Sequence, residues 1–86
     1  MQFEIHEGDD VAFLEYRFYK NINIALMHTV VPESLGGKGI ASALAEYGFQ
    51  YAREHKKLVM VYCPFVAAYV KRHPEVNELL NREFLQ

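Results

Sequence analysis

Three glycines within four positions constrain this chain more than any other feature of its sequence. Gly36, Gly37 and Gly39 stand between a strand-like segment that ends at Pro32 and a helical pattern that begins at about Ile40. Glycine has no Cβ to obstruct an anion, and the start of a helix adds unpaired N–H donors and the positive end of a dipole. The pattern fits a phosphate cradle, and it equally fits a tight corner before a helix.

The glycine turn departs from both common nucleotide-binding signatures. A P-loop requires Gly-Lys-Ser/Thr, whereas Lys38 is followed by Gly39. The dinucleotide fingerprint expects a third glycine where this chain has Ala41 and Ser42, and the segment before the turn begins no βαβ unit. Nucleoside triphosphate hydrolysis and Rossmann-type dinucleotide binding are therefore not expected.

Composition limits the classes of protein to which the chain can belong. The 86 residues are 51% hydrophobic and 14% aromatic, which predicts one folded domain over residues 1–86. A net charge of −2 provides no broad field for nucleic acid, and no apolar run approaches the ~20 residues that span a bilayer. We therefore expect neither a nucleic-acid nor a membrane partner. The first residues lack the pattern of a secretory signal, so a cytoplasmic location is the default expectation.

Alternating apolar and polar residues predict three antiparallel strands before the glycine turn. They are expected over residues 3–6, 11–19 and 22–31. In the third strand, regular alternation predicts that His28 shares a face with Ile24 and Leu26, and that Thr29 points to the other face.

Helical spacing of apolar residues predicts a helix from about Ile40 to His55. The apolar run over residues 58–63 then predicts a central strand that is covered on both faces. Pro64 suits the first position of a second helix, with Cys63 as its N-cap and its end near residues 73–74. Residues 75–86 are compatible with a short terminal helix.

The predicted order is β-β-β-α-β-α, which indicates a small mixed sheet of the α/β (α+β) class with helices covering its faces. The helical crossover makes two strands parallel, and both the glycine turn and Cys63 follow the carboxyl ends of those strands. Open sheets bind ligands at this edge, so the two features are expected to lie close together.

Three side chains are candidates for catalysis. Cys63 at a helix N-terminus is either a thiol activated by the helix dipole or a buried structural cysteine. His28 is a candidate base or an ordinary polar residue, and Tyr69 is a candidate proton donor to a leaving thiolate or a core aromatic. No metal site is expected, because Cys63 is the one cysteine and the four histidines lack ligand spacing.

Two basic segments are candidates for contact with phosphate. Lys38 lies inside the glycine turn and could face a pyrophosphate, although surface lysines are common. Residues 71–73 could contact a phosphate on an adenosine ribose, and a solvated helix end explains them equally well.

Residues 28–32, 35–44 and 63–75 resemble a compact branch of the GCN5-related N-acetyltransferase superfamily, the YjdJ-like or N-acetyltransferase domain-containing group. The resemblance covers nearly the whole chain. It implies a short acetyltransferase fold with an acetyl-CoA cleft where two parallel strands splay apart, and it implies that Cys63 faces the acetyl group.

The resemblance also implies which residues hold the cofactor. In the superfamily, backbone N–H groups of an Arg/Gln-x-x-Gly-x-Gly/Ala motif hold the pyrophosphate. Gly39 and Ala41 match the last two fixed positions, and Gly36 stands at the Arg/Gln position. The residues expected to bind acetyl-CoA are Val31, Gly36, Gly37, Lys38, Gly39, Ile40, Ala41 and Ser42.

The leading hypothesis is an acetyl-CoA-dependent N-acetyltransferase that acts on a primary amine of a small molecule or peptide. Direct attack by the amine is the default, and transfer through Cys63 is the alternative. A CoA or acyl-CoA binding module with little or no turnover is a second class, and an interaction domain with a merely structural glycine corner is a third. The sequence identifies neither the acceptor nor the oligomeric state.

Overall fold

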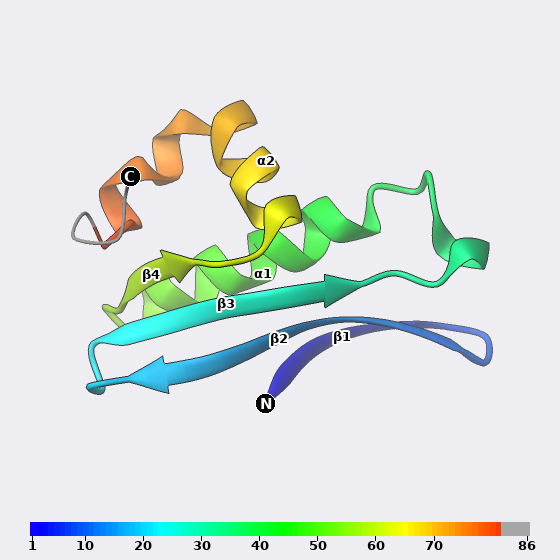
Figure 1. Ribbon diagram of the computed structural model, residues 1–86, viewed down its shortest axis with the longest axis horizontal. Coiled ribbons are helices and arrows are strands. Elements are labelled where there is room, and N and C mark those ends of the chain that lie inside the picture. The colour runs from blue at the N-terminus through cyan, green and yellow to red at the C-terminus, as the bar shows by residue number, and fades with distance from the viewer. Residues whose placement is uncertain (82–86) are drawn as a thin grey trace.

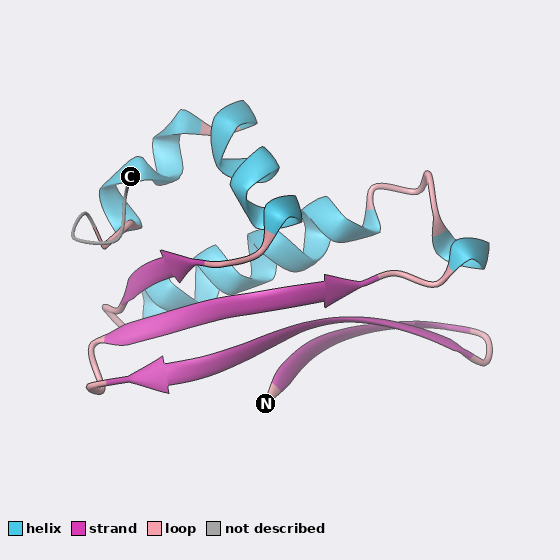
Figure 2. Cartoon of the chain, viewed as in Figure 1, coloured by secondary structure: helices cyan, strands magenta, loops and turns pink. Residues whose placement is uncertain are grey.

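The computed structural model describes residues 1–81, which form one four-stranded mixed sheet and two α-helices (Figure 1). The elements in chain order are β1 (Gln2–Glu7), β2 (Asp10–Tyr19), β3 (Asn23–Val30), the 3-10 turn η1 (Glu33–Leu35), α1 (Ile40–Glu54), β4 (Leu58–Val61), α2 (Pro64–Arg72) and the 3-10 segment η2 (Pro74–Leu79). Three strands precede the helices and the fourth lies between them in the chain. Figure 2 distinguishes the strands from the helices by colour. The predicted α/β class and the order β-β-β-α-β-α are confirmed.

The sheet order is β1-β2-β3-β4, and it follows from local pairing and one crossover. β1 and β2 form an antiparallel hairpin, β2 and β3 are also antiparallel, and β3 and β4 are parallel. α1 makes the crossover between the two parallel strands. Its predicted start at Ile40 is confirmed, and His55 is its C-cap.

The prediction that residues 58–63 form a central strand is wrong, because β4 is the outermost of the four strands. Its outer side meets a single parallel bridge between Val59 and Leu80, and Asn81 N–H donates to the Val59 carbonyl at 2.9 Å. Val59 is buried against the helices and Met60 is buried on the opposite side of the strand. An apolar run indicates that both sides of a strand are buried. Neighbouring side chains can bury a side on which no helix packs.

The helices were expected to cover both faces of the sheet, but α1 and α2 pack on one face. Phe49 of α1 stacks on Tyr69 of α2 with ring centroids 5.7 Å apart, and both belong to the same buried cluster as Ile24 and Leu26 of β3. Figure 1 shows α1 running behind β3 and β4. The crossover places α1 on this face. Because Cys63, the residue just before α2, is buried in the same cluster, α2 begins on this face as well. The opposite face carries no helix within residues 1–81.

Close approach of α1 to the sheet depends on Gly48. A Cβ at this position would lie 3.1 Å from Leu26 Cδ1 and 3.7 Å from Leu14 Cδ2. The missing side chain therefore lets the helix backbone come close to β2 and β3.

A β-bulge in β3 changes which residues share a face. Glu15 pairs with His28 and Tyr16 pairs with Leu26, so Met27 is the extra residue. The predicted placement of His28 beside Leu26 is therefore wrong: His28 lies on the open face with Glu15, and Thr29 lies on the helix side with Cys63. Regular alternation cannot show an inserted residue, because the bulge depends on pairing with β2.

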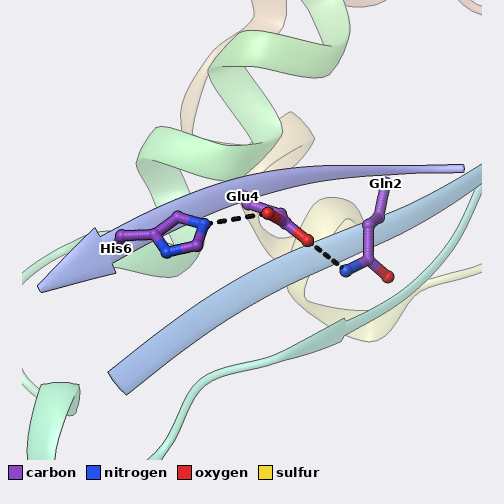
Figure 3. A network of polar contacts seen from close by, with 3 residues as sticks. All are labelled: Gln2, Glu4 and His6. Carbon is purple, nitrogen blue, oxygen red and sulfur yellow. Dashed lines mark hydrogen bonds and ion pairs between the residues drawn. The ribbon is translucent and has the colours of Figure 1, made fainter. Parts of the chain in front are cut away.

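The outer strand β1 exposes a polar row. Gln2 donates to Glu4 at 2.5 Å, and the His6 ring nitrogen lies 2.8 Å from the other oxygen of Glu4 (Figure 3). The hydrogen bond from Gln2 and, to a lesser extent, the one with His6 lower the pKa of the Glu4 carboxyl. Such charged side chains discourage pairing with another sheet edge.

The predicted terminal helix is a 3-10 segment that ends at Leu79, after which Leu80 pairs with Val59. The rest of that prediction falls on residues 82–86, which lie outside the described residues.

Candidate functional site

The two parallel strands part at the carboxyl end of β4. Their pairing ends at Leu26 and Val61, and the last bond runs from Tyr62 N–H to the Leu26 carbonyl at 3.1 Å. β3 continues to Val30, whereas the chain after β4 turns at Cys63 into α2. The segment of β3 after Leu26 therefore has β2 on one side and a gap in strand pairing on the other.

A groove of about 350 Å³ lies where β3 leads into the glycine turn. Its walls come from the end of β3, the glycine turn and the starts of both helices. The lining residues are Val31, Pro32, Glu33, Leu35, Gly36, Gly37, Gly39, Ile40, Ala41, Ser42 and Phe65. All the residues expected to bind acetyl-CoA, apart from Lys38, thus line one groove.

Sequence reasoning missed Phe65 as a groove residue. Phe65 follows Pro64 in the first turn of α2, and 53% of its surface is exposed although it is a large aromatic residue. A signal was present, because the predicted proximity of the glycine turn and Cys63 also brings the residues just after Cys63 to the groove.

The start of α1 presents uncapped N–H groups to this groove. Gly39 is the N-cap with a φ of 71°, and no side chain caps the helix. The first intrahelical bond runs from Ala43 N–H to the Gly39 carbonyl at 3.0 Å. The N–H groups of Ile40, Ala41 and Ser42 therefore have no partner within the helix, and they lie at the positive end of its dipole.

The glycine turn is attached to the β1–β2 hairpin. Ser34 donates to Asp10 at 2.7 Å, and Lys38 Nζ lies 3.5 Å from Glu7 Oε2. The Lys38 side chain thus turns toward an acid on the hairpin. A contact between Lys38 and a pyrophosphate stays a prediction.

Of the second basic segment, Arg72 contacts one residue that lines the groove. Its guanidinium donates to Ser42 Oγ at 3.2 Å, which joins the last turn of α2 to the first turn of α1. His73 instead contacts Glu75 at 3.0 Å.

Cys63 is confirmed as the N-cap residue of α2, with 1% of its surface exposed. Its thiol makes no capping bond to the helix and lies 3.1 Å from the Thr29 hydroxyl. The thiol therefore sits on the helix side of the sheet, close to the point where β3 and β4 part.

The three candidate catalytic side chains do not converge. His28 is exposed on the open face, with Nδ1 3.5 Å from Glu15 Oε1, whereas Cys63 is buried on the helix side. Tyr69 stacks between Phe49 and His73, and its burial raises the pKa of its phenol. Neither His28 nor Tyr69 lines the groove.

Metal ligands and membrane spans are not evident in the described part of the chain. Residues 1–81 contain no group of three or more His, Cys, Asp or Glu side chains that could hold a metal ion. None of the helices in this range has both the length and the apolar character needed to cross a membrane.

Comparison with known proteins agrees with the resemblance to the GCN5-related N-acetyltransferase superfamily, and the three relatives that follow are not YjdJ-like proteins by name. Protein NATD1 of Xenopus tropicalis is 32% identical over 65 residues, which cover 76% of this chain and 60% of that protein. Protein NATD1 of Homo sapiens is also 32% identical over 65 residues, with 76% and 58% covered. The Danio rerio protein is 28% identical over 75 residues, with 87% and 68% covered. The chain therefore spans about three fifths of the length of the first two relatives.

A family model described as GCN5-related N-acetyl-transferase matches residues 2–79. This range contains all four strands, the glycine turn and both α-helices. The chain belongs to the GCN5-related N-acetyltransferase family.

Proposed function

We propose that this protein is an acetyl-CoA-dependent N-acetyltransferase that acts on a primary amine of a small molecule or peptide. The observation that carries the proposal is the groove at the end of β3, where the uncapped start of α1 meets a glycine-rich wall. A Cβ on Gly37 or Gly39 would project into open space, so neither wall position is crowded by the protein itself. Membership of the family supports the same conclusion.

The residues of the groove fit the parts of CoA. The N–H groups at residues 40–42 would hold the pyrophosphate, because they are unpaired donors at a positive dipole end. The unpaired side of β3 from Met27 to Val31 would hydrogen-bond the pantetheine amides as a neighbouring strand does. Phe65 would cover one side of the bound chain. Acetyl-CoA would supply an activated acetyl group at the place where β3 and β4 part.

Besides holding the cofactor, the protein would orient the reactants and stabilise the charge that develops on the thioester carbonyl. Backbone donors near the bulge at Met27 would polarise the thioester carbonyl. The amine would attack directly. Transfer through Cys63 is the alternative route, and the burial of Cys63 together with its contact to Thr29 makes direct attack the simpler one.

A CoA-binding module with little or no turnover is the second candidate function. The observation that favours it is the lining of the groove, in which Glu33 is the one titratable side chain. His28 and Tyr69 lie elsewhere.

We also propose that residues 1–86 act as one domain in the cytosol, where a free thiol such as Cys63 stays reduced.

An amide-resolved NMR titration with acetyl-CoA, with CoA in parallel, tests cofactor binding. We expect saturable shifts over residues 36–42 and at Phe65, and a difference between the two ligands near Cys63. Release of free thiol in the presence of a panel of primary amines then separates the two candidate functions. Binding with no turnover supports the module, and no shift at millimolar ligand contradicts both.

A further inference from the structure

The open face of the sheet carries a second pocket, distinct from the groove at the glycine turn. It has a volume of about 440 Å³, and its lining includes Arg17, Tyr19, Ala25, Met27, Met60 and Tyr62. These residues come from the three strands β2, β3 and β4 and from the position after β4. The proposed cofactor groove has no lining residue in common with this pocket.

The pocket lies at the place where the strands part. Met27 directly follows Leu26 and Tyr62 directly follows Val61, and Leu26 and Val61 are the last paired residues of β3 and β4. On the helix side, the same place is occupied by the part-buried contact between Cys63 and Thr29. A second substrate therefore has access to the parting strands from the open face.

The walls of the pocket favour an apolar body with one anionic end. Ala25, Met27 and Met60 provide apolar surface, whereas Arg17 provides a cation. The Arg17 side chain has no ion pair or hydrogen bond with any residue in the range 1–81. The nearest acid along the strand, Glu15, is directed to His28 at 3.5 Å.

A second cation strengthens the positive end of the pocket. Lys20 Nζ lies 5.5 Å from the ring centre of Tyr19, which lines the pocket. The chain as a whole carries a net charge of −2, so this positive end is a local feature. An arginine beside apolar walls is suited to a carboxylate, which it can bind through two parallel N–H donors.

We infer that this pocket binds the acceptor, and that the acceptor is a primary amine carrying a carboxylate at the far end of a short apolar chain. The length of the apolar chain follows from the sheet, because Arg17 pairs with Ala25, two residues before Met27. At about 3.3 Å per residue, the Arg17–Ala25 pair and Met27 are roughly 7 Å apart along β3, which sets the scale of the apolar chain. This inference rests on the proposed acetyltransferase function.

The transfer balances without a further reactant. The unprotonated amine forms a C–N bond to the acetyl carbon, the C–S bond breaks, and its electron pair stays on the CoA sulfur. The proton lost from the nitrogen is taken up by that sulfur, which yields the amide and free CoA thiol.

The test compares 6-aminohexanoate with hexylamine, which share a six-carbon chain and differ in the carboxylate. With saturating acetyl-CoA and the full chain, kcat/KM is expected to be roughly tenfold to a hundredfold higher for 6-aminohexanoate, as a charge-assisted contact provides. Arg17→Gln should remove this preference by lowering kcat/KM for 6-aminohexanoate. Arg53→Gln, which removes the same charge from the end of α1, is the control and should keep the preference.

Equal rates with the two amines, or a preference that survives Arg17→Gln, would overturn the inference while the acetyltransferase function stands. A chain that binds no CoA contradicts the proposed function instead. If CoA binds without turnover, the NMR signals of the Met27 methyl and the Arg17 guanidinium test the pocket instead. Saturable shifts with 6-aminohexanoate and none with hexylamine support the pocket. Shifts with neither amine, or shifts that follow protein concentration as in self-association, overturn it.

Discussion

The hydroxyl of Thr29 lies 3.1 Å from the thiol of Cys63, although the two residues are 34 positions apart in the chain. Thr29 belongs to β3 beyond its last pair with β4, and Cys63 is the N-cap of α2. The contact therefore ties the two diverging segments together on the helix side of the sheet. The bulge at Met27 is what turns Thr29 to that side.

Cys63→Ala separates the two routes of transfer. Direct attack by the amine predicts turnover close to that of the unchanged chain, because the thiol then serves only packing and the contact with Thr29. A covalent route predicts loss of turnover, since the residue that would carry the acetyl group is gone. Thiol release at saturating acetyl-CoA is the measurement, and Cys63→Ser is a second variant of nearly unchanged size.

Thr29→Val removes the hydroxyl and keeps the shape of the side chain. We expect the free energy of unfolding to fall by about 1 kcal/mol, as for loss of one hydrogen bond. Urea unfolding of Thr29→Val, Cys63→Ala and the double variant measures the coupling. The two losses should sum to more than the loss in the double variant, because both single changes break the same contact. Strict additivity would contradict the bond.

Gly39→Ala should weaken acetyl-CoA binding as well as stability. Its φ of 71° costs about 1–2 kcal/mol for a residue with a Cβ, and the Cβ would stand at the groove. Gly8→Ala is the matched control, because Gly8 has a φ of 61° and lies in the β1–β2 hairpin. Both variants should lose similar stability in urea, and Gly39→Ala alone should raise the Kd for acetyl-CoA. Equal Kd values in the two variants would count against the cradle.

Substitution of two phenylalanines is expected to separate an effect on stability from an effect on cofactor binding. Phe49→Ala should cost about 3–5 kcal/mol of stability, because the ring is 2% exposed and stacks on Tyr69. Phe65→Ala should change stability by no more than about 0.5 kcal/mol, because its ring is largely exposed. It should raise the Kd for CoA, since Phe65 lines the groove. Titration calorimetry and urea unfolding of both variants check this division.

Alkaline pH should reveal the burial of Tyr69. Burial, with a smaller effect of the charges on Glu46 and Glu75, raises the pKa of its phenol in the folded protein. The unfolded phenol, with a pKa of about 10, therefore loses its proton first, so this contribution to stability is complete below that pH and is lost as pH rises through the folded pKa. Tyr69→Phe should make the free energy of unfolding less dependent on pH in this range. Tyr47→Phe, at an exposed tyrosine of α1, is the matched control.

Local residue patterns were sufficient to predict the elements and their order. Helical spacing placed the start of α1 at Ile40, and proline chemistry placed the start of α2 at Pro64 with Cys63 before it. These features depend on neighbours within one or two turns, so they can be predicted from local residues. The glycine turn also lies where the sequence indicated, between a strand and a helix.

Contacts between distant segments set which faces and edges meet. The bulge that separates His28 from Thr29 arises from pairing with β2, and the outer position of β4 arises because no further strand of residues 1–81 pairs along it. The Lys38 contact with Glu7 spans 31 positions, and Phe65 reaches the groove through the packing of α2 on α1. Each of these depends on contacts between segments distant in sequence. Local periodicity carries no record of such contacts, so the wall that Phe65 adds to the groove and the direction of Lys38 could be found only from the folded chain.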